Sequence, residues 1–186
     1  LSGGADSACL AFILCKIIMK NNWHVQIDVI THSRVWQKRP WASVVSVNVY
    51  HKLREMFPDI ISARFTNYIP PELEYASLGH IVNKRSGDQI AVDSFNNYLA
   101  NVNGYNAIYN ATTKNPSTKK PIHGRMANRD FDLQDIRLED LVINRKNYWI
   151  LLPLKIVEKD WIVKQYIDND YLDLFAITRS CEGDEG

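Results

Sequence analysis

The sequence of 186 residues lacks most features that mark secreted, membrane or polyanion-binding proteins. It has only three cysteines, too few and too scattered for a disulfide framework, which predicts a reducing, cytoplasmic environment. The apolar stretch at residues 8–19 falls short of the ~20 residues that a bilayer needs, and it lacks signal-peptide flanks. A formal net charge of +1 gives no reason to expect a membrane partner, and it counts against nucleic acid without excluding it.

The composition is that of an ordinary folded protein. Hydrophobic residues make up 46% and charged residues 23% of a chain whose length fits one domain, residues 1–186. Apolar periodicity predicts helices alternating with short apolar strands, which favours an α/β protein with a mainly parallel sheet covered by helices on both faces. The predicted helices are 8–19, 40–56, 88–104 and 158–168, and the predicted strands are 24–31, 60–65, 106–111 and 148–152. Residues 112–147 are too irregular for this pattern and are interpreted as an insertion or lid.

The most informative stretch is Ser-Gly-Gly-Ala-Asp-Ser at residues 2–7. Adjacent Gly3 and Gly4 can adopt backbone angles that a β-carbon forbids, so their N–H groups can turn inward as an anion-binding nest. The helix predicted directly after them adds the positive end of its dipole. Asp6 could hold a magnesium ion against phosphate oxygens. The stretch therefore predicts a phosphate-binding loop; the alternative is a glycine turn before a core helix.

The spacing and the lysine of the nucleoside-triphosphatase P-loop are absent. Ser2-Gly3-Gly4-x-Asp6-Ser7 resembles instead the pyrophosphate loop of the N-type ATP pyrophosphatases. This resemblance implies a three-layer fold of the adenine nucleotide alpha hydrolase type with a five-stranded sheet. Leu1 would then end a first strand that the sequence lacks. It also implies ATP and Mg²⁺ as cofactors, bound by Leu1, Ser2, Gly3, Gly4, Ala5, Asp6 and Ser7.

The C-terminal third narrows the resemblance. Pro153-Leu154, the helix start Glu158-Lys159-Asp160-Trp161-Ile162, and Thr178-Arg179-Ser180-Cys181-Glu182-Gly183 are similar to segments of the 7-cyano-7-deazaguanine synthase family of the queuosine pathway. The family implies a C–N ligase that converts 7-carboxy-7-deazaguanine, a 7-deazapurine carboxylate, and ammonia to the nitrile. It also makes Cys181 the first of four zinc-binding cysteines. The other three are absent here, so either zinc is not bound or those ligands lie outside this sequence.

Further site residues follow from the resemblance. Lys159 would reach the phosphates and Arg179 the substrate carboxylate, which with Asp6 completes the predicted catalytic set. Thr31 and His32 follow a predicted strand and would lie near adenine and ribose, while Lys114 would supply a cation to the triphosphate. The alternatives stay open: an exposed loop histidine, a solvated or first-turn lysine, and a surface arginine.

Two other functions remain open from the residues alone. One keeps the adenylation chemistry but directs it to a tRNA base or a sulfur carrier. The other is a non-catalytic ATP-binding module of an anti-phage or regulatory system. The sequence does not decide between a monomer and a homodimer.

Overall fold

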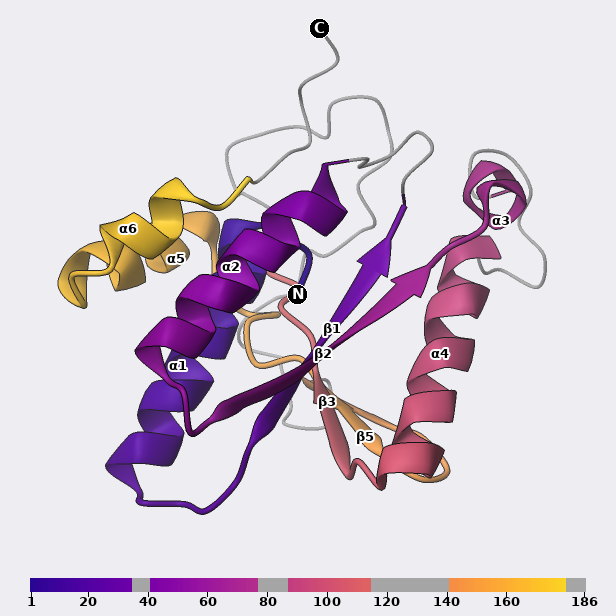
Figure 1. Cartoon of the computed structure of the whole chain (residues 1–186), viewed down its shortest axis with the longest axis horizontal. Coiled ribbons are helices and arrows are strands. Elements are labelled where there is room, and N and C mark those ends of the chain that lie inside the picture. Colours follow the sequence, from indigo (N-terminus) through magenta and orange to yellow (C-terminus); the bar gives the residue numbers. More distant parts are fainter. Residues whose placement is uncertain (35–40, 77–86, 115–140, 180–186) are drawn as a thin grey trace, which may run out of the picture.

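The computed structural model describes residues 1–34, 41–76, 87–114 and 141–179, which form a mixed α/β structure (Figure 1). The N-terminal half alternates helix and strand: α1 (Ala5–Lys20), β1 (Ile27–Ser33), α2 (Ala42–Met56) and β2 (Ile61–Tyr68). β1 and β2 pair in parallel, with Val29 opposite Arg64 and Thr31 opposite Thr66. Since paired residues of a parallel sheet share a face, this register decides which polar side chains meet.

The second half begins with α3 (Pro71–Ala76) and α4 (Gly87–Asn103). It continues with three strands of three residues each, β3 (Ala107–Tyr109), β4 (Val142–Asn144) and β5 (Trp149–Leu151). β5 is the central strand, parallel to β3 and antiparallel to β4. Two helices end the described chain, α5 (Lys159–Asp168) and α6 (Leu172–Ala176).

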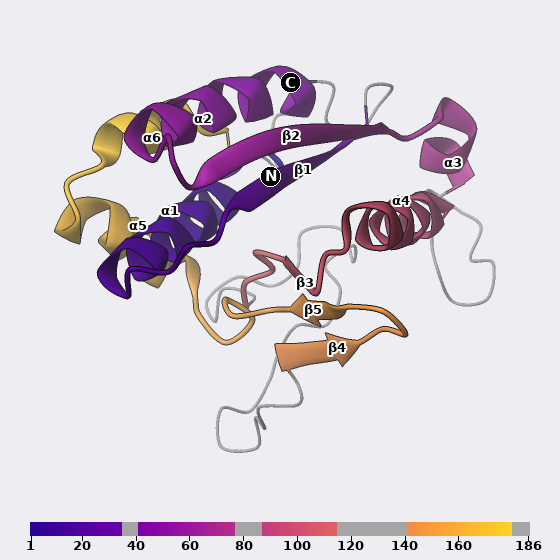
Figure 2. The same ribbon diagram turned by 60° about the horizontal axis from the view of Figure 1, so that its bottom comes forward.

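The expectation of an α/β protein is confirmed, but the expectation of one five-stranded parallel sheet is wrong for the described residues. Their strands form two separate sheets, β1-β2 and β3-β5-β4. β4 lies within the stretch predicted to be irregular, and its antiparallel pairing makes the second sheet mixed. Figure 2 shows β1 and β2 between α2 on one side and α4 with the second sheet on the other.

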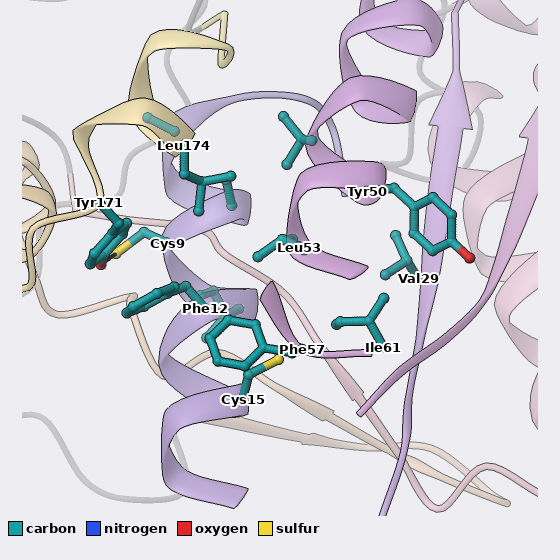
Figure 3. Close-up of a cluster of buried hydrophobic side chains, with 14 of the residues drawn as sticks. Cys9, Phe12, Cys15, Val29, Tyr50, Leu53, Phe57, Ile61, Tyr171 and Leu174 are labelled. Carbon is teal, nitrogen blue, oxygen red and sulfur yellow. Dashed lines mark hydrogen bonds between the residues drawn. The ribbon is translucent and has the colours of Figure 1, made fainter. Parts of the chain in front are cut away.

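The main core lies around α1, whose residues are buried on several sides as its uniformly apolar sequence predicts. Phe12 stacks on Tyr171 at 3.6 Å between ring centroids (Figure 3). The Tyr166 hydroxyl donates a 2.6 Å hydrogen bond to the carbonyl of Ala5. Aromatic side chains from the C-terminal helical region thus hold the first turn of α1 in place. Cys9 and Cys15 are buried in this core, as predicted, and burial raises the pKa of both thiols.

None of the helices in the described ranges is long and apolar enough to cross a membrane. The organisation of residues 1–186 as one domain stays a prediction.

Candidate functional site

The loop before α1 has a backbone conformation that requires glycine. Gly3 has φ +80°, in the left-handed region. A β-carbon at this position would also lie 2.9 Å from Cγ1 of Val45 and 3.0 Å from the backbone nitrogen of Ser46. The carbonyl of Gly3 accepts a 2.9 Å hydrogen bond from the backbone N–H of Arg179. The loop is therefore fixed between the first turns of α2 and the end of the described chain.

Within the described structure, the N–H groups of Ser2, Gly3, Gly4, Asp6 and Ser7 do not donate to main-chain carbonyls. The N–H groups of Ser2 and Gly4 donate instead to hydroxyls, that of Ser7 at 3.2 Å and that of Ser2 at 3.3 Å. The N–H groups of Gly3, Asp6 and Ser7 have no hydrogen-bond partner within the described ranges. Because the first N–H groups of a helix have no intrahelical partner, those of Asp6 and Ser7 can receive an anion, and that of Gly3, two residues before α1, can join them.

Asp6, in the first turn of α1, collects contacts from two distant parts of the chain. Its Oδ2 accepts hydrogen bonds from Nζ of Lys159 and, at 3.3 Å, from Oγ1 of Thr113. Its other oxygen, Oδ1, is buried and has no partner in the described structure. A buried carboxylate oxygen without a donor is suited to a cation, so this carboxylate fits the magnesium that the sequence predicts.

Lys114 and Glu158 join the same group of residues. Lys114 donates its backbone N–H to the carbonyl of Val157 at 2.9 Å, and its ammonium lies 3.8 Å from Glu158. Lys159 is the first residue of α5, beside Glu158. The structure therefore brings three predicted residues to one place, namely Asp6, Lys114 and Lys159. A cation at a helix start opposes the dipole, and here the carboxylate of Asp6 offsets that charge.

Thr31 and His32, both on β1, point to opposite faces of the first sheet. Thr31 is fully buried, and its hydroxyl has no partner among the described residues. The Nδ1 atom of His32 lies 3.1 Å from the amide nitrogen of Asn67, and Phe95 of α4 contacts the ring edge-on. Burial is the main cause that lowers the pKa of His32 to about 4, and the nearby charge of Arg34 adds to it. His32 is therefore neutral at pH 7 and packed against α4, unlike an exposed loop histidine.

Arg179 contacts Trp41, and Leu1 is bonded to β1. The guanidinium of Arg179 lies 5.1 Å from the ring centroid of Trp41, a cation–π contact. The amino group of Leu1 donates to the carbonyl of Ile30 on β1. Cys181, the predicted zinc ligand, lies outside the described residues. Within those residues, no three His, Cys, Asp or Glu side chains form a group that could hold a metal ion.

Two site residues were not singled out from the sequence. Thr113 belongs to a segment expected near the loop, but its bond to Asp6 joins positions more than a hundred residues apart, which no local pattern signals. Arg64 of β2 belongs to no motif in the sequence, and it bonds to Ser46 of α2, whose backbone lies against Gly3. A cavity of about 600 Å³ is lined by the end of α1, residues 22–26 and the segment after α2, at the other end of the first sheet from the loop.

Comparisons with protein-family models, curated proteins and solved structures found no match. The site is therefore interpreted from its own geometry and from the resemblance of its motifs.

Proposed function

We propose that the chain binds ATP at residues 2–7 and acts as an adenylating enzyme that releases AMP and pyrophosphate. The observation that carries this proposal is that the N–H groups of Gly3, Asp6 and Ser7, beside the Asp6–Lys159 pair, have no partner in the described parts of the chain. Amide donors at a helix start, a lysine and a carboxylate are the groups that bind a pyrophosphate with its magnesium ion.

The parallel pairs β1–β2 and β3–β5 support a nucleotide-binding arrangement of the adenine nucleotide alpha hydrolase type. In such a fold, ligands lie outside the carboxyl ends of parallel strands. His32, near the carboxyl end of β1, is neutral and packed beside Phe95. We propose that this aromatic and amide-lined region lies next to the base and ribose of the nucleotide.

The proposed reaction begins with a substrate carboxylate. One carboxylate oxygen attacks the α-phosphorus of ATP, the bond to the bridging oxygen of the β-phosphate breaks, and pyrophosphate leaves into the loop. Ammonia then displaces AMP from the acyl adenylate and gives an amide after loss of a proton. With 7-carboxy-7-deazaguanine, the amide oxygen would then attack the α-phosphorus of a second ATP and displace pyrophosphate, and loss of AMP and of both amide protons would leave the nitrile.

This chain's own groups would orient and neutralise the reactants. Gly3, Asp6 and Ser7 would donate main-chain N–H bonds to the departing phosphates, and Lys159 would move from Asp6 to a phosphate oxygen. That exchange leaves Asp6 free to hold magnesium, which supplies further charge neutralisation when bound. We propose a cytoplasmic enzyme with a small-molecule substrate.

Pyrophosphate release tests the proposal. The protein is incubated with ATP, Mg²⁺, 7-carboxy-7-deazaguanine and ammonium, and released pyrophosphate and the nitrile are measured. Replacing the deazapurine by tRNA or a sulfur-carrier protein tests the other adenylating function. ATP binding without pyrophosphate release in any mixture would contradict an enzyme and favour a non-catalytic ATP-binding module. Failure to bind ATP at all would contradict both.

Two lysines of α5 give a matched pair of variants. Lys159→Met removes the cation beside Asp6, whereas Lys164→Met removes a cation of the same helix whose partner is Asp168 at 2.6 Å. Because hydrogen bonds to charged groups contribute about 1.5–3 kcal/mol, Lys159→Met should weaken Mg·ATP binding by about 10- to 100-fold. Lys164→Met should leave binding unchanged. Equal binding by both variants would contradict the assigned role of Lys159.

A further inference from the structure

Arg64 is a cation that has no carboxylate partner among the residues that the structure describes. It is only partly exposed, and its guanidinium Nη2 donates to two uncharged oxygens, Oγ of Ser46 at 3.0 Å and the carbonyl of Ser43 at 3.4 Å. Its Nε is buried and unpaired within the described part of the chain. No carboxylate of those residues lies within the 4.0 Å of an ion pair with it. Since a partly buried charge is usually paired, this arrangement calls for an anion.

The position of Arg64 connects this charge to the loop. Ser46, which accepts its hydrogen bond, is the residue whose backbone nitrogen lies 3.0 Å from where a β-carbon of Gly3 would be. Arg64 therefore reaches the first turn of α2 at the point where that helix contacts the loop.

Buried hydroxyls lie on the same sheet face as Arg64. Arg64 is opposite Val29, so Thr31 and Ser33, two and four residues further along β1, share that face and alternate with His32 on the other. Both side chains are fully buried, and in the described structure neither hydroxyl has a hydrogen-bond partner. Buried hydroxyls without partners are rare in folded proteins, so their occurrence on this face is a second, independent sign of a ligand.

We propose that Arg64, Thr31 and Ser33 form an oxyanion-binding site behind the glycine loop, which receives phosphate or carboxylate oxygens of the ligand. The guanidinium of Arg64 can only donate and is positively charged, and the two hydroxyls can also donate, a set that matches an oxyanion better than a cation or an apolar ring. The burial of both hydroxyls limits the entering group to a small one. The identity of the ligand rests on the proposed function, whereas the need for an anion follows from the charge and partial burial of Arg64.

The test compares Arg64→Gln and Arg64→Lys with Arg54→Gln, an exposed arginine of α2 bonded to the Tyr50 hydroxyl. Binding of pyrophosphate, AMP, ATP and 7-carboxy-7-deazaguanine is measured by calorimetry, and melting temperatures are measured with and without each ligand. Arg64→Gln should weaken binding of at least one of them by about 10- to 100-fold. Arg64→Lys should weaken this binding less, because the positive charge stays. Some binding should still be lost, because lysine lacks the paired N–H donors of the guanidinium. Arg54→Gln should bind like the wild type.

The melting temperature separates a ligand role from a structural one. An unpaired cation contributes little to the unliganded fold, so Arg64→Gln should melt no lower than Arg54→Gln without ligand and should lose the ligand-induced rise. Thr31→Val gives a second variant, expected to keep its unliganded melting temperature and to bind less tightly. Unchanged binding of all four ligands in Arg64→Gln and Thr31→Val would overturn the proposal.

The pattern of losses identifies the oxyanion. A loss with pyrophosphate indicates the leaving group, a loss with AMP and ATP alone indicates the α-phosphate, and a loss with the deazapurine alone indicates the substrate carboxylate. If wild type and both variants bind all four ligands equally, including ATP, the proposed oxyanion site is wrong and the proposed function stands. If ATP does not bind but pyrophosphate binds in an Arg64-dependent way, the proposed function is wrong while this site stands.

Discussion

Replacing Gly3 by alanine should destabilise the fold more than a glycine replacement elsewhere with the same backbone conformation. At φ +80°, an alanine is strained by roughly 1–2 kcal/mol. Its β-carbon would also lie 2.9 Å from Cγ1 of Val45 and 3.0 Å from the backbone nitrogen of Ser46. The side chain of Val45 can move slightly, but the backbone of α2 cannot, which adds about 1–3 kcal/mol of packing strain.

Gly104, after α4, provides the matched control. Its φ of +69° gives a similar strain, but a β-carbon there has no neighbour within 4 Å. In both variants the alanine also restricts the unfolded chain, which offsets about 0.4–1 kcal/mol. We therefore expect Gly104→Ala to lose about 1 kcal/mol and Gly3→Ala about 2–4 kcal/mol of unfolding free energy.

Urea unfolding followed by circular dichroism measures both values, with the slope of the transition checked for two-state behaviour. The difference between the variants isolates the contact of the loop with α2, since the backbone strain is common to both. If Gly3→Ala lost no more stability than Gly104→Ala, the loop would not be fixed against Ser46. The geometry on which the anion site depends would then be wrong.

Three further predictions concern side chains. Burial lowers the pKa of His32 from 6.5 to about 4. The contribution of the neutral imidazole to the free energy of unfolding is therefore complete above about pH 6.5 and is lost as the pH falls toward 4, which lowers that free energy by about 3 kcal/mol. Urea unfolding at several pH values should show His32→Gln less acid-sensitive than the wild type, and identical profiles would contradict this. A double-mutant cycle with Asp6→Asn and Lys159→Met should give a coupling of about 0.5–1 kcal/mol that decreases with salt; a value near zero would contradict the pair. Tyr105→Phe removes the hydroxyl that donates to Asp28 between α4–β3 and the first sheet, and should lose about 1–3 kcal/mol in urea unfolding; no loss would contradict that link.

The elements with strong local patterns could be predicted from the sequence. The uniformly apolar helix after the loop, the β-branched strand around Val29, and the helix ended by Pro58 all lie within a few residues of their predicted positions. β4 was missed because three residues, Val142–Asn144, are too few for an alternation to be recognised. The pairing of strands was also not predictable, because sheet membership depends on partners distant in sequence and not on the periodicity of one segment.

The same division between local and distant information applies to the candidate site. The conformation of Gly3 is encoded within six residues, because two glycines before a helix have few other structural uses. The role assigned to Arg64 has no such encoding, since an arginine in a strand is usually an exposed residue. It becomes significant only when the fold places it against α2 without a carboxylate, beside hydroxyls of β1 that also have no partner in the described structure. The unpaired groups, more than the motif, therefore indicate where a ligand's charge is to be accommodated.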